Sequence, residues 1–333
     1  MATAPLLSVR RLRVLYARRG LLPGFMSGGR PADIRAIDDL HFDLQAGETL
    51  GIVGESGCGK STLARTLVGL QEATSGSIRY NGTELIGLSP KEWRPLRREV
   101  QLVFQDPLAS LSPKMKIVDI VAEPLKALRP EFDAATRRSR ALALLERVGL
   151  GPELADRKPR ELSGGQGQRV GIARALIVEP KLLICDEPVS ALDVSIQAQI
   201  INLLTELARE RNLAMIFIAH DLAVVRQLSD RVLVMYLGKV MEQGRADNVY
   251  ARPRHPYTRA LLEAAPVIEA DGSKPKKRRL LGGDTPNPAQ PPMGCVFHPR
   301  CPLAEHACVQ SVPLLRRVDG EQYAACHFVA AGG

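Results

Sequence analysis

Four short and almost wholly apolar segments stand out along the first 220 residues. They are TLGIVG (49–54), VQLVFQ (100–105), KLLICD (181–186) and AMIFIAH (214–220), and helical patterns separate them. A strand that is covered on both faces has a continuous apolar run, whereas a half-exposed strand alternates. The pattern therefore predicts an α/β fold with a parallel sheet between two layers of helices.

The segments between these strands divide the chain further. A mostly helical stretch from about 107 to 180 contains RRSRALALLERVGL (137–150) and QRVGIARALIVE (168–179), the second ending at Pro180. RVLVMYLGKVMEQG (231–244) is typical of a hairpin with its turn at 237–239. Proline becomes frequent beyond residue 250. We expect one large domain at 1–250, with 107–180 as a helical subdomain, and a smaller C-terminal extension at 251–333.

Composition and charge exclude several classes of protein. No apolar run approaches the roughly 20 residues that span a bilayer, and the start, MATAPLLSVRRLRV, differs from a secretory signal, so we expect a cytoplasmic chain. The net charge of +9 is scattered, apart from KPKKRR at 274–279. That run is typical of a solvated linker. The more specific alternative is a segment that faces a membrane surface. The sequence therefore predicts no nucleic-acid partner.

The first candidate for chemistry is GESGCGKST, which follows an apolar strand and precedes the helical pattern TLARTLVGL. Gly-x4-Gly-Lys-Ser in this context is a P-loop, whose backbone N–H groups surround phosphate oxygens at a helix N-terminus. Lys60 is expected to reach the β and γ phosphates, and Ser61 to bind Mg²⁺. The predicted phosphate cradle comprises Gly54, Glu55, Ser56, Gly57, Cys58, Gly59, Lys60, Ser61 and Thr62.

Polar residues end three of the apolar strands. Asp186 and Glu187 follow one strand, Gln105 ends another and His220 a third. Successive strand residues point to opposite sides, so the two carboxylates can act separately: Asp186 toward Mg²⁺ and Glu187 as general base for a water. Open α/β sheets bind ligands at their carboxyl edge. The sequence therefore predicts that these four side chains surround one γ-phosphate.

The chain contains a second glycine-rich segment that is suited to binding an anion, in addition to the P-loop. LSGGQGQRV (162–170) places Ser163, Gly164, Gly165 and Gln166 before an amphipathic helix, which is again suited to an anion. Taken in order, the P-loop, Gln105, LSGGQ, LLICDEP, SALD (190–193) and His220 resemble the nucleotide-binding subunit of an ABC transporter over about residues 6–245. The resemblance implies an ABC-type P-loop NTPase with a mixed sheet core, ATP and Mg²⁺ as cofactors, and ATP hydrolysis coupled to transport.

The same resemblance assigns roles to individual residues. In this family two subunits form a head-to-tail sandwich, and the signature of one closes on the ATP of the other. Ser163, Gly165 and Gln166 would then contact the partner's nucleotide, and Asp193 would communicate between the two sites. Gln105 would join Ser61 and Asp186 around Mg²⁺ and couple the site to the membrane subunits, while His220 would position the γ-phosphate. Tyr16 would stack on adenine.

Further sequence segments indicate one subfamily of ABC ATPases. FQDPLASLSPKMKIVDIVAEPL (104–125), RPRHPYTRALLEAAP (252–266) and the cysteine-rich tail are similar to ATP-binding subunits of bacterial dipeptide and oligopeptide importers. The Gly/Pro-rich insertion at 18–35 is similar to the second ATPase of such systems. The resemblance implies a paralogous ATPase partner, two membrane permeases and an external solute-binding protein, at the cytoplasmic face of the membrane. Nickel, glutathione or a glycoside are alternative solutes, and a DNA-repair ABC ATPase with a zinc module is the more distant alternative.

The C-terminal cysteines are the last candidate site. Cys295, Cys301, Cys308 and Cys326 are spaced C-x5-C-x6-C-x17-C, and disulfides are rare in a reducing cytoplasm. Zinc usually uses close Cys-x2–4-Cys pairs, whereas four thiolates on an irregular loop suit an iron–sulfur cluster. The matching tail in some peptide-importer ATPases carries a [4Fe-4S] cluster. We therefore expect these four residues to bind such a cluster. A Zn²⁺ ion is the alternative metal, and the simplest interpretation is that the cysteines are grouped by chance.

Overall fold

The computed structural model describes residues 4–17, 33–190, 192–264 and 282–329. Most of the predicted insertion at 18–35, the basic run at 274–279 and one residue of the 190–193 segment lie outside these ranges. Among the helices that are described, none has the length and apolar character needed to cross a membrane.

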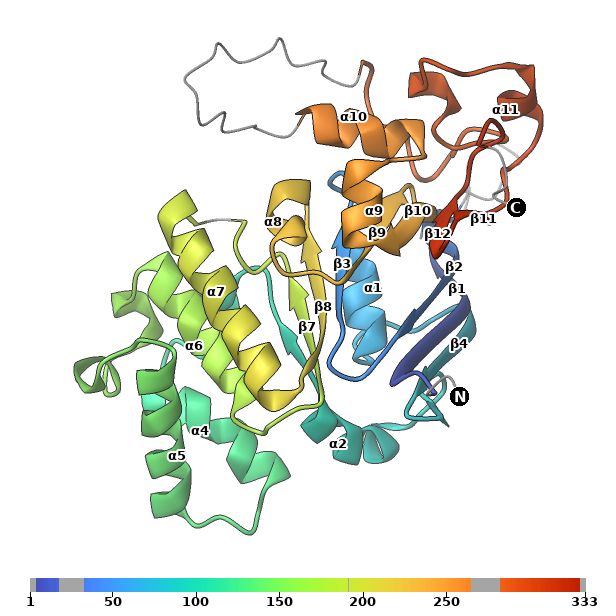
Figure 1. The fold of residues 1–333 in the computed structure, drawn as a ribbon. Helices are drawn as coiled ribbons and strands as arrows, with labels where there is room; N and C mark the ends of the chain where they lie inside the picture. Colours follow the sequence, from blue (N-terminus) through green and yellow to red (C-terminus); the bar gives the residue numbers. More distant parts are fainter. Residues whose placement is uncertain (1–3, 18–32, 191, 265–281, 330–333) are drawn as a thin grey trace, which may run out of the picture.

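An eight-stranded sheet forms the centre of the molecule, with strand order β11-β12-β10-β9-β3-β8-β7-β6 (Figure 1). Its parallel members include the four apolar segments that the sequence predicted as strands, and the hairpin predicted at 231–244 supplies β9 and β10. The parallel strands are β3 (Thr49–Val53), β6 (Val100–Val103), β7 (Leu182–Asp186), β8 (Ala214–Ala219) and β9 (Arg231–Tyr236), and β10 (Lys239–Arg245) is antiparallel to β9.

Successive residues of the central strands enter two different hydrophobic cores. In β7, Leu182 and Ile184 belong to one core, whereas Leu183 and Cys185 belong to the other, and all four are almost completely buried. This alternation is what a sheet covered on both faces requires. It explains why the strands are apolar at every position and why their sequence signal is so clear.

One face of the sheet carries a second, antiparallel sheet and two helices. The antiparallel sheet has the order β2-β1-β4-β5, formed by β1 (Leu7–Tyr16), β2 (Ile34–Leu44), β4 (Ser75–Tyr80) and β5 (Thr83–Glu84). Helices α1 (Lys60–Leu67) and α2 (Pro90–Glu99) contribute Leu63, Leu67 and Trp93 to the same core. This layer was not predicted from the sequence.

The opposite face carries the remaining helices of the first 250 residues. They are α3 (Pro107–Ser110), α4 (Ile117–Leu128), α5 (Ala134–Arg147), α6 (Gly164–Leu176), α7 (Val194–Arg211) and α8 (Leu222–Arg226). Helix starts follow from local chemistry: Ser89, Asp106 and Asp133 each accept a hydrogen bond from the backbone N–H three residues further on. Helix α7 ends at Asn212, whose φ of 48° turns the chain away.

The C-terminal residues, which the sequence predicted as a smaller extension at 251–333, pack onto the central sheet. Helices α9 (Ala246–Ala251) and α10 (Pro256–Ala264) follow β10, and α11 (His306–Gln310) precedes β11 (Arg316–Asp319) and β12 (Gln322–Ala324). Strand β12 pairs with β10, so the tail extends the central sheet, as Figure 1 shows. Tyr257, Val296 and Phe297 also join the same core as α6 and α7. The sequence missed this attachment because β12 has only three residues.

A buried carboxylate fastens this attachment. Glu242 of β10 is fully buried, and its oxygens accept hydrogen bonds from the backbone N–H groups of Arg254 and His255 and from the amide of Gln322. The three distances are 2.8, 2.9 and 2.6 Å. One side chain therefore joins β10, the segment before α10 and β12.

Replacing Glu242 by Ala should remove the shared acceptor of these three donors, including the buried N–H of His255. An unpaired buried donor costs about 1–3 kcal/mol, so we expect the unfolding free energy to fall by about 3 kcal/mol or more. Denaturant unfolding followed by circular dichroism measures this change. Glu321→Ala is the matched control because Glu321 is exposed in the turn that directly precedes β12, and it should change stability by less than about 0.5 kcal/mol. Equal losses in both variants would contradict this role for Glu242.

Candidate functional site

The P-loop joins the end of β3 to the start of α1, as the sequence predicted. Gly59, with φ of 106°, precedes α1, and a Cβ atom there would lie 2.1 Å from the carbonyl oxygen of Ala36. Only glycine fits this position. Gly59 has no side chain to cap α1, so the N–H groups of the first turn are oriented toward the loop, where phosphate oxygens could accept from them.

Lys60 lies inside the loop that precedes it. Its side chain is 3% exposed, and Nζ donates to the carbonyl oxygens of Gly54 at 2.7 Å and of Glu55 at 3.1 Å. Nζ is also 3.7 Å from Oε1 of Glu187. The ammonium group is thereby held between the predicted phosphate cradle and the predicted general base.

Asp186 ends β7 beside the start of α1. Its Oδ1 accepts a hydrogen bond from Oγ of Ser61 at 3.0 Å. Burial raises the pKa of Asp186, the neighbouring Glu187 raises it further, and the Ser61 hydrogen bond acts in the opposite direction. A buried carboxylate beside a hydroxyl has the oxygen donors that Mg²⁺ prefers. The residues present therefore fit the predicted magnesium ion.

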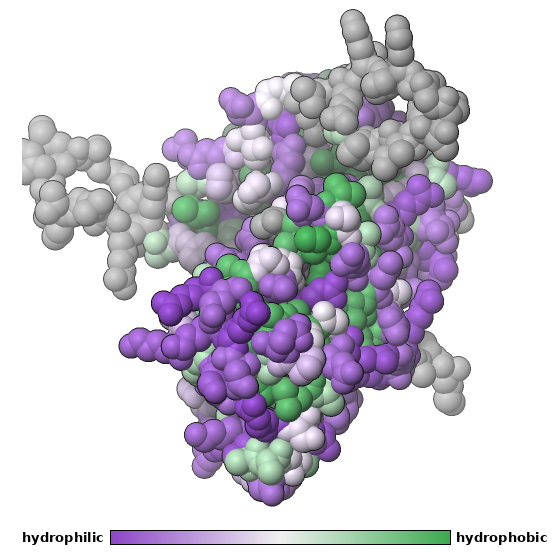
Figure 2. Space-filling model, turned by 90° about the vertical axis from the view of Figure 1, so that its left-hand side faces the viewer, coloured by the Kyte–Doolittle hydropathy of each residue, from purple (hydrophilic) through white to green (hydrophobic). Residues whose placement is uncertain are grey.

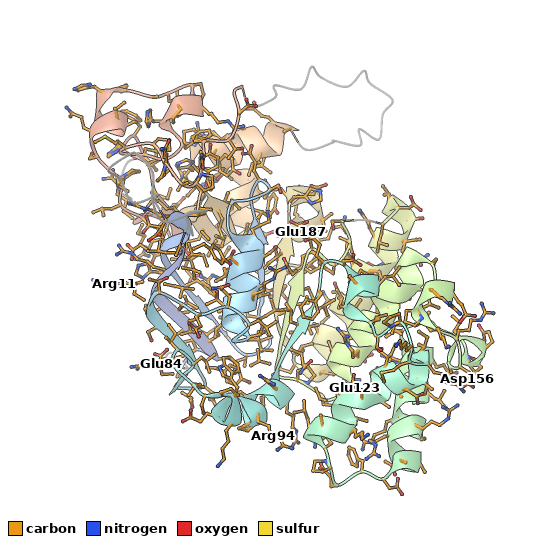
Figure 3. All side chains as sticks on the ribbon, turned by 180° about the vertical axis from the view of Figure 1, so that it is seen from behind. Arg11, Glu84, Arg94, Glu123, Asp156 and Glu187 are labelled. Atoms are coloured by element: carbon orange, nitrogen blue, oxygen red, sulfur yellow. The ribbon has the colours of Figure 1, made fainter. Side chains whose placement is uncertain are left out.

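Glu187 is the meeting point of three strand ends. Its Oε2 accepts from Nε2 of Gln105 at 3.0 Å and lies 3.9 Å from Nδ1 of His220. The φ of Glu187 is 46°, an uncommon conformation for a residue with a side chain, and its N–H donates to the carbonyl of Ile218 on β8. Figure 3 places Glu187 at the end of the sheet near the start of α1. The structure thus brings together Lys60, Gln105, Glu187 and His220.

Tyr16 also lies at this site. It ends β1, and its hydroxyl is 3.3 Å from Oγ1 of Thr62 in the first turn of α1. The predicted adenine-stacking residue is therefore adjacent to the P-loop helix.

The signature segment lies elsewhere. Ser163 caps α6 through a capping box: its Oγ accepts from the N–H of Gln166, and its own N–H donates to Oε1 of Gln166. This cap makes α6 begin at Gly164, four residues before the predicted start. The helix also ends earlier than predicted, at Leu176, before Glu179 with its φ of 58°.

The two glycine-rich helix starts belong to opposite faces of the central sheet. Leu63 and Leu67 of α1 lie in one core, whereas Val170 and Ile172 of α6 lie in the other. In Figure 1 the strands β7 and β8 stand between α1 and α6. Ser163 and Gly164 are exposed, and Asp193 precedes α7 without capping it through its side chain. Within one chain the signature is therefore separated from the P-loop.

Comparison with known proteins agrees with this geometry. Residues 37–190 match the family described as ABC transporter, and residues 241–308 match the family described as oligopeptide/dipeptide transporter, C-terminal region. The oligopeptide transport ATP-binding protein OppF of Escherichia coli (strain K12) is 56% identical over 285 residues, which cover 86% of this chain and 85% of that protein. The di/tripeptide transport ATP-binding protein DppF of Pseudomonas aeruginosa (strain UCBPP-PA14) is 51% identical, covering 93% of each.

The chain belongs to the ATP-binding proteins of oligopeptide and dipeptide ABC transporters. It is accordingly an ABC-type ATPase, as the sequence predicted. Among solved structures, a dimeric ATP-binding cassette in a post-hydrolysis state with ADP and Pi is similar, with a TM-score of 0.64 and 29% identity. The match covers 72% of this chain and 98% of that one.

The cysteine-rich segment of this ABC ATPase does not support the predicted metal centre. Cys295, Cys308 and Cys326 are buried and Cys301 is partly exposed, and the thiols lie close enough to raise the pKa of Cys295 electrostatically. Burial is the larger cause and raises that pKa to about 11. Among the described residues, no group of three or more His, Cys, Asp or Glu side chains is arranged to hold a metal ion.

Sequence reasoning missed contacts between the C-terminal extension and the P-loop of this ABC ATPase, among them those of Tyr257 and Arg300. The hydroxyl of Tyr257 accepts from the N–H of Glu55, and the guanidinium of Arg300 pairs with the carboxylate of Glu55. They are 202 and 245 residues away from Glu55 in the chain. In the sequence, Arg300 is recognisable only as the arginine that precedes Cys301, and that position does not indicate which residue it pairs with.

Proposed function

We propose that this chain is the motor subunit of an importer for oligopeptides and dipeptides, and that ATP hydrolysis takes place around Glu187. The observation that carries the proposal is the position of its carboxylate, 3.0 Å from Gln105, 3.7 Å from Lys60 and 3.9 Å from His220. The names of the curated relatives support peptides as the solute. They favour neither a nickel, glutathione or glycoside importer nor a DNA-repair ATPase.

The proposed mechanism follows from the side chains at the carboxyl edge of the central sheet, around Glu187. The triphosphate binds to the backbone of 54–62, with Lys60 at its β and γ phosphates and His220 near the γ-phosphate. Ser61, Asp186 and Gln105 would hold Mg²⁺, which would supply positive charge that neutralises the phosphates. Glu187 accepts a proton from the attacking water. Tyr16, beside Thr62, stacks on adenine.

The site is completed by a second cassette. The signature lies on the opposite sheet face from the P-loop helix, so Ser163, Gly165 and Gln166 would contact the nucleotide of another subunit rather than their own. Of the three, Ser163 is exposed, Gln166 is partly exposed and Gly165 is buried. Dimeric cassettes among the similar structures support this arrangement. We propose that the partner is a paralogous ATPase and that Asp193, before α7, connects the two sites.

The membrane subunits dock beside Gln105. A groove of about 750 Å³ is lined by residues from α2, β6, α3 and α4, with Phe104, Gln105 and Glu123 among them. Figure 2 views the side of the molecule that carries α4 to α6 and shows hydrophobic surface between hydrophilic residues. In Figure 3, Glu123 marks α4, below Glu187. A short helix of either permease fits such a groove, which would place the subunit at the cytoplasmic face of the membrane, with a solute-binding protein on the other side.

The domain boundaries at residue 250 and the cysteine centre remain part of this proposal. Residues 251–333 act as the extension typical of peptide-importer ATPases, and the match at 241–308 supports that assignment. Cys295, Cys301, Cys308 and Cys326 are the candidate ligands of a [4Fe-4S] cluster or, alternatively, of Zn²⁺. The support is their proximity, since Cys301, Cys308 and Cys326 all influence the pKa of Cys295.

Glu187→Gln should preserve ATP binding and remove turnover. The amide keeps the shape of the side chain but cannot accept the proton, so ATPase activity of the assembled transporter should fall about 10²-fold or more. Phosphate release measures turnover, and equilibrium dialysis with labelled ATP measures binding. Glu146→Gln, which makes the same chemical change at an exposed position of α5, is the control. Turnover near the wild-type rate in Glu187→Gln would remove Glu187 from this role.

Ser163→Arg should block the partner's site without affecting the chain's own nucleotide binding. The large cation fills the space for the partner's γ-phosphate, so transporter ATPase should be lost while ATP affinity of the purified chain is kept. Ser89→Arg is the control, because Ser89 also forms a capping box, with Glu92, and its loss costs a similar ~1 kcal/mol. If Ser163→Arg weakens ATP binding by its own chain, the sandwich arrangement is wrong.

The cysteine centre is tested by anaerobic purification with metal analysis. A [4Fe-4S] cluster would give brown protein with four iron atoms per chain, and Cys301→Ser should lose both colour and iron. Cys185→Ala is the control, since Cys185 is buried in β7 outside the C-terminal extension. Colourless protein with stoichiometric zinc would establish the alternative, and four free thiols without metal would exclude both.

A further inference from the structure

Three residues of the C-terminal extension converge on Glu55, the second residue of the P-loop. The guanidinium of Arg300 donates two hydrogen bonds to its carboxylate, from Nη1 to Oε2 at 2.6 Å and from Nη2 to Oε1 at 3.0 Å. Oγ1 of Thr285 donates to Oε2 at 3.0 Å. The N–H of Glu55 donates to the hydroxyl of Tyr257 at 3.0 Å. One P-loop residue therefore has both its backbone and its side chain bound by the extension.

The Arg300–Glu55 pair is a strong interaction by its geometry and burial. The Arg300 side chain is 7% exposed and that of Glu55 24%, so water competes little with the two parallel hydrogen bonds. Arg300 also donates to the hydroxyl of Tyr236 at 3.3 Å. The hydrogen bonds to Glu55 raise the pKa of Arg300 above its already high ordinary value. The guanidinium therefore stays protonated beside Glu55.

Packing of the extension fixes the position of Arg300. The residue ends a 3₁₀ turn, His298–Arg300, that directly follows Phe297. Phe297 is fully buried, with its ring centroid 5.3 Å from that of Tyr236 and 5.2 Å from that of Tyr257. The N–H of Cys301 closes the turn on the carbonyl of His298. The guanidinium is thus presented to the P-loop by a well-packed aromatic cluster.

The contacted residue matters because Glu55 also touches Lys60. The carbonyl oxygen of Glu55 accepts from Nζ of Lys60 at 3.1 Å, so the position of Glu55 helps to set that of the lysine. A carboxylate in a phosphate-binding loop repels the triphosphate unless a cation neutralises it. Among the described residues, Arg300 is the cation that pairs with this carboxylate.

We propose that Arg300 is a positioning residue for ATP binding: it neutralises the Glu55 carboxylate and holds the P-loop in its nucleotide-binding shape. ATP binding by the cassette thereby depends on a correctly packed C-terminal extension. The inference rests on the proposed function, in which residues 54–62 bind ATP. It assigns to the extension a role in the ATP site itself.

Removing each member of the pair should have opposite effects on ATP affinity. Arg300→Ala leaves Glu55 charged beside the triphosphate, and the Kd for MgATP of the purified full-length chain should rise about tenfold. Glu55→Gln removes the charge, so its Kd should equal the wild-type value or fall below it. The double variant should recover most of the lost affinity. Equilibrium dialysis with labelled ATP measures all four proteins, and thermal unfolding measures their stability.

Two further variants separate this role from simple structural support. Arg300→Lys keeps the charge but loses the bidentate hydrogen bonding to Glu55, so its Kd should lie between those of the wild type and Arg300→Ala. This variant keeps the test usable if Arg300→Ala does not fold. Arg254→Ala breaks another ion pair of the extension, with Asp319 at 3.0 Å, and should leave the Kd unchanged.

Each remaining outcome decides the question. Equal weakening of ATP binding in Arg300→Ala and Glu55→Gln, or no recovery in the double variant, would mean that the pair only supports the fold and would overturn the inference. Unchanged affinity in Arg300→Ala would also overturn it, with the proposed function intact. A wild-type chain that binds no ATP would instead overturn the proposed function, and the inference with it.

Discussion

Burial of both faces of the central sheet determines where the chemistry of this protein is located. Strands β3, β7 and β8 are apolar at nearly every position, so their first polar side chains appear where the strands end. Because these strands are parallel, their ends share one edge. Asp186, Glu187 and His220 come together there because they end neighbouring strands, and the P-loop brings Lys60 to the same edge. The same burial places α1 and α6 on opposite faces, which separates the two phosphate-binding segments.

This dependence explains which features the sequence could predict. Continuous apolar runs and a glycine-rich turn are local signals, so the parallel strands, the P-loop and the carboxylates at the edge could be located within a few residues. The hairpin was also predictable, since Leu237 and Gly238 supply the two left-handed positions of its turn. Helix α6 was less well placed, because the capping box of Ser163 and Gln166 starts it within the glycines, which have low helix propensity.

The features that could not be predicted depend on contacts between distant parts of the chain. The antiparallel layer of β1, β2 and β4 has bulges in its registers, and the half-buried pattern of its strands is weak in the sequence. Strand β12 is defined by pairing with β10 and by the contact of Gln322 with Glu242 rather than by its own composition. Arg300 stands between two cysteines, which directed attention to metal binding. Its partner is instead Glu55, 245 residues earlier.

The strand order shows why the extension reaches the P-loop at all. Strand β12 pairs with β10, β10 with β9, and β9 with β3, whose end is the P-loop. The hairpin turn between β9 and β10 is already in contact with it, because the N–H of Gly238 donates to the carbonyl of Cys58 at 2.9 Å. A segment that continues from β10 therefore starts near the phosphate-binding loop. Packing of Tyr257 and Phe297 against Tyr236 of β9 keeps the segment there, so that Arg300 and Glu55 meet without a long connecting path.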